Sequence, residues 1–189
     1  MSNVTSLGPP AADGGADVPS EVAGFTHHRE ATARVSASAR EVFERLDDQT
    51  RLAEHMGRPS AMMGGGRMTY EFDVLRGQAV GSHIRMGGEA FGFRLFVDEV
   101  VTVRDPPRRK VWRTTGEPRL IIIGAYEMGF EIVDEGTSSR LRVWIDYARS
   151  DRGWSRRVPA LADLYARWCV GRMVSDAVQH FASAGAQAA

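Results

Sequence analysis

The polar side chains that could do chemistry in this chain do not form a known catalytic motif. Five histidines are present, at His27, His28, His55, His83 and His180. No HExxH motif and no carboxylate spacing typical of a metal site accompanies them, so we expect neither a bound metal nor a cofactor. A GxSxG nucleophile motif and a P-loop lysine are also missing, and Gly64-Gly65-Gly66 lacks the strand-to-helix context of a dinucleotide site.

His83 is the one catalytic candidate that the sequence offers. It lies in a segment of alternating character, and its phase places it outward, opposite to Ile84. A bulge near Gly81 or Gly87 would turn it inward, where an imidazole could act as a general acid or base. A second polar pair, Arg172 and Asp176, has helical i, i+4 spacing. It is either a surface ion pair or the polar rim of a cavity mouth.

Aromatic side chains with polar tips are the other group that could contact a ligand. These are the hydroxyls of Tyr70, Tyr126, Tyr147 and Tyr165 and the indole N–H groups of Trp112 and Trp168. Buried groups of this kind normally find a hydrogen-bond partner, so they could orient a ligand with a ring and a few oxygen atoms. The alternative is that they simply fill the core.

Strands are predicted from alternation of apolar and polar residues. Thr26–Val35 has a weak strand signal, and six stronger segments follow: Met68–Val74, Val80–Met86, Glu89–Arg104, Arg108–Thr115, Leu120–Val133 and Ser139–Ala148. The connections are short and rich in glycine and proline, for example Gly116-Glu117-Pro118, which indicates antiparallel hairpins. The charged residues define the wet face, so these side chains are expected to point inward: Phe93, Leu95, Trp112, Thr114, Tyr126, Met128, Phe130, Ile132, Leu141, Val143, Ile145 and Tyr147.

Helices are predicted on both sides of these six strands. Ser38 and Glu41 form a capping box that begins a short helix ending near Asp47, and a second short helix is expected over Thr50–Met56. A long helix is expected over Gly153–Ala184. Its apolar residues form an i, i+4 row made of Leu161, Tyr165, Cys169, Met173, Ala177 and Phe181, with Leu164, Trp168, Val174 and Val178 beside it. This row winds around the helix, which suits packing against a twisted sheet.

Length and composition limit the classes of protein that fit. The 189 residues suggest one domain over 25–184, preceded by a disordered tail over 1–24 and followed by a flexible C-terminus over 185–189. Basic and acidic residues balance at 24 each, which argues against a nucleic-acid partner. No apolar run is long enough for stable membrane insertion, and a lone cysteine with no secretory signal indicates a cytoplasmic protein.

The order of elements and several local motifs resemble the SRPBCC superfamily, which has the helix-grip (START-like) fold, and especially its polyketide cyclase/dehydrase-like bacterial members. The motifs are Val35-Ser36-Ala37-Ser38-Ala39-Arg40-Glu41-Val42-Phe43, Val80–Gly88, Pro106-Pro107-Arg108-Arg109-x-x-Trp112 and Leu164–Met173. The resemblance covers about residues 26–183 and implies an α+β fold. Its curved antiparallel sheet of about seven strands would wrap around one long C-terminal helix, with two short helices after the first strand.

This fold implies an internal cavity between the sheet and the long helix. The residues expected to bind a ligand there are Tyr70, Phe72, Phe93, Trp112, Tyr126, Met128, Phe130, Tyr147, Leu161, Tyr165 and Trp168. Three functions compete: a binding module for a small hydrophobic or aromatic molecule (carrier, sensor or sequestration), a cyclase/dehydratase-type lyase or isomerase, and a protein-interaction module like the heat-shock ATPase activators. The binding module is preferred, because an enzyme needs a titratable group inside the cavity and alternation places none there. The oligomeric state is left open, with a homodimer among the options.

Overall fold

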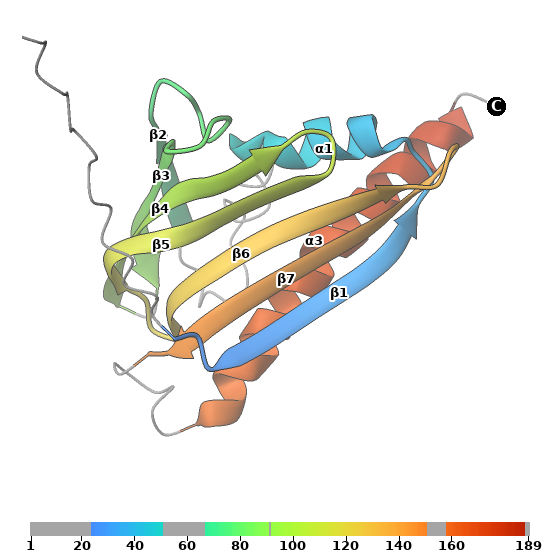
Figure 1. The fold of residues 1–189 in the computed structure, drawn as a ribbon. Helices are drawn as coiled ribbons and strands as arrows, with labels where there is room; N and C mark the ends of the chain where they lie inside the picture. Colours follow the sequence, from blue (N-terminus) through green and yellow to red (C-terminus); the bar gives the residue numbers. More distant parts are fainter. Residues whose placement is uncertain (1–23, 51–66, 91, 151–157, 188–189) are drawn as a thin grey trace, which may run out of the picture.

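A computed structural model describes residues 24–50, 67–90, 92–150 and 158–187 of the chain. Their elements are β1 His27–Val35, α1 Ala39–Asp47, β2 Arg67–Phe72, β3 His83–Ala90, β4 Phe93–Asp105, β5 Arg109–Arg119, β6 Ile123–Asp134, β7 Ser139–Arg149 and α3 Pro159–Gln187. The seven strands form one antiparallel sheet in the order β1-β7-β6-β5-β4-β3-β2. The predicted α+β fold, a curved sheet with one long C-terminal helix, is confirmed (Figure 1).

The capping box predicted for the first helix is present. The Ser38 backbone N–H donates to the Glu41 carboxylate at 2.9 Å, and the Glu41 N–H donates to the Ser38 hydroxyl at 3.4 Å. Together these bonds satisfy donors that a helix N-terminus leaves unpaired, so α1 begins at Ala39 as expected. Helical conformation resumes at Gln49 and Thr50, but the rest of the predicted second helix lies outside the described residues.

Several strand boundaries differ from those predicted: β2 ends at Phe72, and the segment predicted as one strand over Glu89–Arg104 is divided between β3 and β4. Gly116-Glu117-Pro118 does not form a turn, because β5 continues to Arg119 and the connection to β6 follows it. Val80 is 60% exposed in a turn, and β3 begins only at His83. The turn is held by the Ser82 hydroxyl, which donates to Asp73 at 2.6 Å and accepts from the Gly77 N–H at 2.8 Å.

The long helix also has different ends. α3 begins at Pro159, where a missing N–H is tolerated, and it continues to Gln187. The predicted boundary at Ala184 is therefore three residues too early, and the expected flexible C-terminus over 185–189 begins within the helix. The proposed start near Gly153 falls in 151–157, and the proposed N-terminal tail falls in 1–23; both lie outside the described residues.

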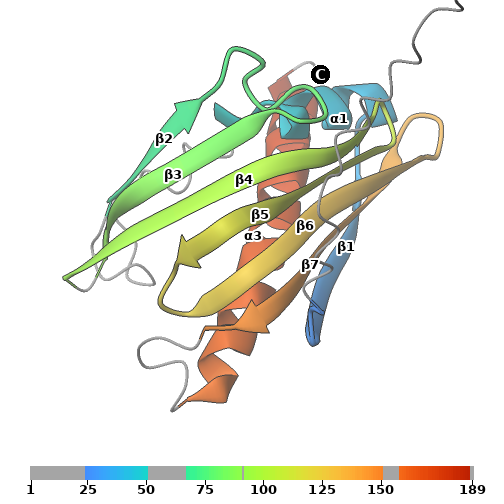
Figure 2. The ribbon, with the colours of Figure 1, turned by 60° about the vertical axis from the view of Figure 1, so that its left-hand side comes forward.

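The position of α3 across the sheet decides where a site could form. The helix packs mainly against β1 and β7, at one side of the sheet. Figure 2 shows β2, β3 and β4 extending away from the helix on the opposite side. None of the helices among the described residues is long and apolar enough to cross a membrane.

Candidate functional site

α3 meets the sheet through a row of small or branched residues. The buried members of this row are Ala162, Ala166, Val170, Val174 and Ala177. Small side chains let the helix approach β1 and β7 closely. The bulkier row predicted to be buried is offset by one position. Within it Tyr165, Cys169 and Met173 are only partly buried, whereas Ala177, which belongs to both rows, is 1% exposed. Leu164, predicted beside the row, is 57% exposed.

A carboxylate lies on the inner face of the sheet, at Glu99 in β4. Val97 and Val101, two residues before and after it, are each 1% exposed, and Glu99 itself is 4% exposed. These three side chains share one face because alternate residues of a strand do. In the neighbouring strand Glu99 pairs with Thr114. Among the described residues no other carboxylate faces this part of the sheet interior; Asp47, below, lies at its α1 end.

Two neighbours orient the Glu99 carboxylate. The Tyr126 hydroxyl on β6 donates a hydrogen bond to Glu99 Oε1, and the Trp112 indole on β5 interacts with the carboxylate and favours its charged form. Thr114 fixes the backbone of Tyr126, because its hydroxyl accepts from the Tyr126 N–H at 3.1 Å. The carboxylate therefore has a defined position, held by two adjacent strands.

The environment shifts the protonation of Glu99. Loss of hydration on burial raises its pKa to about 7, although hydrogen bonds from Tyr126 and Trp112 and the positive charge of Lys110 act in the opposite direction. A carboxyl group with this pKa can both accept and release a proton near neutral pH. Such groups often mark functional sites.

Three weakly acidic side chains surround Glu99 and remain neutral. Burial raises the pKa of Tyr70, and it raises that of Cys169 to about 12. Interaction with Cys169, together with burial, raises the pKa of Tyr165 well above the ordinary tyrosine value. Since the charge of Glu99 acts on Tyr70 and on Tyr165, β2, β4 and α3 contribute to the same group of side chains. We refer to Glu99, Tyr126, Trp112, Tyr70, Tyr165 and Cys169 as the inner cluster.

Several members of the inner cluster lie deep in the protein and still have accessible surface. Burial raises the pKa of Tyr70 and Cys169, yet both side chains, like Tyr165, are only partly buried by accessible area. A side chain in a solid core would have no accessible area left. Tyr70, Tyr165 and Cys169 therefore keep side-chain surface that a ligand could contact.

The residues predicted to bind a ligand divide into three groups. Trp112 and Tyr126, at 3% and 8% exposed, belong to the inner cluster, as do Tyr70 and Tyr165. Others are close to it or in the surrounding core: Phe72 stacks on Tyr70 with ring centroids 6.1 Å apart, Trp168 lies 6.0 Å from Tyr165, and Met128 and Leu161 are buried and partly buried. Phe130, Tyr147 and Phe93 lie elsewhere.

The positions of these last three have separate explanations. Phe130 is fully buried and packs edge-on against Phe43 and Trp112, so it belongs to the solid core. Tyr147 donates to Asp163 of α3 at 3.3 Å. Phe93 was expected to point inward, but it is 52% exposed because it begins β4, at the end of the sheet.

The two polar features predicted from the sequence each expose one partner to solvent, whereas Asp98 and Asp176 are only 18% and 11% exposed. His83 Nδ1 lies 2.9 Å from Asp98, and the His83 side chain is 40% exposed, so the imidazole faces away from the inner cluster, as its strand phase predicts. Arg172 donates to Asp176 at 3.1 Å and is 54% exposed. No group of three or more metal-ligating side chains occurs among the residues that the structure describes.

A buried ionic group adjoins the inner cluster at the end of α1. The Lys110 ammonium is completely buried and donates to the Asp47 carboxylate at 2.8 Å and to the Asp47 carbonyl at 3.0 Å. Arg104 donates to the same carboxylate through Nε and Nη2. Burial lowers the pKa of Lys110, whereas Asp47 favours its charged form. The lysine is fully engaged by this helix end, so we assign it a structural role.

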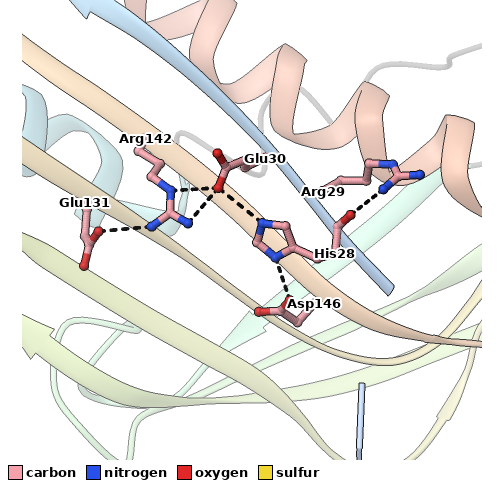
Figure 3. Close-up of polar contacts among 6 residues, drawn as sticks. All are labelled: His28, Arg29, Glu30, Glu131, Arg142 and Asp146. Carbon is pink, nitrogen blue, oxygen red and sulfur yellow. Dashed lines mark hydrogen bonds and ion pairs between the residues drawn. The ribbon is translucent and has the colours of Figure 1, made fainter. Parts of the chain in front are cut away.

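The outer face of the sheet carries a different polar network, shown in Figure 3. Arg142 donates to Glu30 at 2.6 Å and to Glu131 at 3.3 Å, and His28 bridges Glu30 and Asp146. These side chains are 32–46% exposed, and surface pairs of this kind contribute little stability. The network is on the opposite face of the sheet from the inner cluster.

Comparison with known proteins identifies the fold. No protein-family model matches the chain, and no curated protein matches it. Solved structures do match. They include TTHA0849 from Thermus thermophilus, with a TM-score of 0.61, 12% identity and coverage of 84% of this chain and 99% of that one. Norcoclaurine synthase from Thalictrum flavum matches with a TM-score of 0.55, 16% identity and coverage of 82% and 87%.

An aromatase/cyclase, Zhui from Streptomyces sp. R1128, matches with a TM-score of 0.53, 16% identity and coverage of 80% and 93%. At 12–16% identity these matches show a shared fold. The protein has the helix-grip fold, as predicted from the sequence.

Sequence reasoning missed Glu99. A signal was available, because Phe93 and Leu95 were assigned to the inner face and the same alternation continued along the strand places Glu99 inside. Glu99 would have supplied the titratable group whose absence counted against an enzyme. The structure thus brings together an acid–base group, neutral hydrogen-bond donors and aromatic surface.

Proposed function

We propose that the protein binds a small hydrophobic molecule with a ring and a few polar atoms, between the inner face of the sheet and α3. The observation that carries the proposal is that α3 packs mainly against β1 and β7, while Tyr70 of β2 and Tyr165 and Cys169 of α3 are only partly buried against the core. Aromatic walls supply contact area, and the tyrosine hydroxyls can fix the orientation of a polar group. Carriage, sensing and sequestration all fit this activity.

The similar structures support the proposal without establishing it. One of them is norcoclaurine synthase in complex with dopamine and hydroxybenzaldehyde, which are both small aromatic molecules. At 16% identity the likeness shows the fold alone. It makes an aromatic ligand a reasonable first choice for a probe.

The first experiment is a titration with N-phenyl-1-naphthylamine, a neutral apolar dye, followed by dye fluorescence and by quenching of tryptophan emission. Two variants of α3 locate the dye. Cys169→Phe adds bulk on the side of the helix that faces the inner cluster, whereas Ser175→Phe adds the same bulk at an exposed position.

We expect saturable binding by the wild type and by Ser175→Phe, and at least tenfold weaker binding by Cys169→Phe with a cooperative unfolding transition retained. Equal binding by all three proteins would contradict the proposed location. Unfolding of Cys169→Phe would also contradict it, because a new ring is tolerated only where space exists. Native mass spectrometry of freshly purified protein would identify any ligand that copurifies.

A cyclase/dehydratase-type enzyme is the second candidate, and a specific observation favours it. Glu99 is a titratable group inside the region proposed to hold the ligand, with a pKa raised to about 7 by burial. The fold likeness to an aromatase/cyclase is compatible with this candidate. Turnover of a polyketide-like substrate would distinguish it from a carrier, and loss of turnover without loss of binding in a Glu99 variant would assign the chemistry.

Other properties of the protein are also proposals. We infer a cytoplasmic location, supported by the single cysteine. The 24 basic and 24 acidic residues balance, which argues against a nucleic-acid partner. The domain is proposed to begin at residue 25 and to end with α3 at Gln187, and deletion of 1–23 is expected to change the free energy of unfolding by less than about 1 kcal/mol. Sedimentation would decide between a monomer and a homodimer.

A further inference from the structure

We propose that Glu99 is a general base and general acid that moves a proton at a carbon atom next to a ligand carbonyl, so that the protein enolises or isomerises a hydrophobic ketone. The inference rests on the proposed function, because the ketone must lie between β4 and α3. It goes further by naming the ligand class, the reaction and the residue that performs it.

Position is the first argument. Glu99 lies in the middle of a strand, and its carboxylate is fixed by the hydroxyl of Tyr126 and the indole of Trp112. A base held on a strand keeps one geometry, which general base catalysis requires. The second carboxylate oxygen has a lone pair for the ligand, since a carboxylate can accept about four hydrogen bonds.

The neutral donors are the second argument. An enolate carries negative charge on oxygen, and hydroxyl groups in a dry site stabilise it more strongly than water does. Tyr165 and Tyr70 are neutral phenols that lie close enough to Glu99 to sense its charge, and they come from α3 and β2, whereas Tyr126 and Trp112 come from β6 and β5. The Tyr70 O–H group is suited to donate to the ketone oxygen while Glu99 takes the proton from carbon, and the Tyr165 O–H group can do so by giving up its hydrogen bond with Cys169.

The proposed step balances without any added reactant. The Glu99 carboxylate removes a proton from the carbon beside the carbonyl, and the C–H electron pair forms a C=C bond. The carbonyl π electrons move to oxygen, which accepts hydrogen bonds from the tyrosine hydroxyls. Glu99, now a carboxylic acid, exchanges its proton with solvent and then protonates the same carbon, giving hydrogen exchange, or it delivers the proton to a conjugated carbon, giving isomerisation. No oxidant, reductant or water is consumed.

The charges around Glu99 set the expected pH dependence. Lys110 on β5 lowers the pKa of Glu99, and Asp98 on β4 raises it. The other ionisable groups that sense the charge of Glu99 are Tyr126, Tyr70 and Tyr165. Cys169 and the tyrosines stay protonated near neutrality because their pKa values are raised. The reactive form is therefore the Glu99 carboxylate, and the rate should rise with pH through about 7 and then level off.

The test measures hydrogen–deuterium exchange at carbon 2 of 1-tetralone, an apolar bicyclic ketone, by NMR in D2O. Saturation-transfer signals from the same samples report binding. The variants are Glu99→Gln, which keeps the shape and removes the base, and Glu127→Gln, which makes the same change on the outer face of β6. We expect exchange above the buffer rate for the wild type and for Glu127→Gln, and at least a hundredfold less catalysed exchange for Glu99→Gln with binding retained.

Tyr126→Phe provides a second readout that does not depend on Glu99→Gln folding. The Tyr126 hydrogen bond stabilises the carboxylate, so its removal should raise the pKa of Glu99 and move the midpoint of the pH–rate profile upward. A purely structural role would lower the rate at every pH and leave the midpoint unchanged.

The outcomes separate this inference from the proposed function. Binding of 1-tetralone without catalysed exchange, or exchange that survives in Glu99→Gln, would overturn the inference and leave the binding function in place. Failure of the naphthylamine dye to bind would overturn both.

Discussion

Replacement of Glu99 by glutamine should change how the stability of the protein depends on pH. Glutamine has nearly the same shape and can still accept the Tyr126 hydrogen bond, but it cannot ionise. In the wild type, ionisation of Glu99 places a negative charge in the interior. The variant removes that charge and leaves every other titrating group as it was.

The size of this change in the free energy of unfolding follows from the pKa of Glu99. An ordinary glutamate has a pKa of 4.5, and burial raises that of Glu99 to about 7, a difference equivalent to about 3 kcal/mol. Between these pH values the folded protein retains a proton that the unfolded chain has released. Raising the pH therefore favours unfolding, so this stability is present below about 4.5 and is lost as the pH rises to about 7.

Urea denaturation, followed by far-UV circular dichroism at pH 5 and at pH 8, measures the effect. The free energy of unfolding of Glu99→Gln minus that of the wild type should increase by about 2 to 3 kcal/mol between the two pH values. Glu127→Gln, on the outer face of the sheet, should show no comparable increase. A difference that stays constant for Glu99→Gln would refute the argument that burial controls this carboxyl group.

Three further predictions concern residues that take no part in the proposed proton transfer. Asp47→Asn removes the carboxylate that pairs with a fully buried lysine, and urea denaturation should show a loss of about 3 to 5 kcal/mol; a loss below about 1 kcal/mol would contradict the pairing. Gly129→Ala should cost about 1 to 3 kcal/mol, since its Cβ would lie 2.6 Å from the Trp144 ring, whereas Gly87→Ala, with nothing nearer than 3.8 Å, should cost much less; equal losses would be inconsistent with this packing. Cys169, whose pKa is raised to about 12, should react with iodoacetamide at pH 8 more than tenfold slower in the folded protein than in urea, and equal rates would argue against its burial.

Much of the sheet could be predicted because charged residues mark its wet face. In β6 the glutamates at 127 and 131 fix the phase, and Tyr126, Met128 and Phe130 are buried as expected. In β7, Leu141 and Tyr147 are likewise buried. Alternation is reliable here because one face is solvated and the other packs against the core and α3.

The rule that charged residues mark the wet face also explains why Glu99 was missed. A charged residue suggests an outward position, and burial of a carboxylate is favourable only when partners compensate for lost hydration. Those partners are distant in sequence: Tyr126 is 27 positions away. Lys110 is a similar case, since it bonds to a residue 63 positions earlier. Local patterns contain no information about such contacts.

Trp144 illustrates a second limit of the pattern. Its phase places it on the outer face, yet it is only 7% exposed. The guanidinium groups of Arg109 and Arg142 lie 5.6 and 5.3 Å from its ring, and the absence of a side chain at Gly129 leaves room for it. Arginine side chains can cover an aromatic ring while keeping their charge in water, so outward phase does not guarantee exposure.

The opposite positions of two tryptophans allow a direct test of the central claim, that a small hydrophobic molecule binds on the inner face of the sheet. Trp112 belongs to the inner cluster, and Trp144 lies on the outer face. Their indole N–H signals can be followed separately in a ¹H–¹⁵N correlation spectrum during titration with 1-tetralone. We predict a saturable shift of the Trp112 signal while the Trp144 signal stays in place. A saturable shift of Trp144 alone, or no saturable shift of Trp112, would contradict the account.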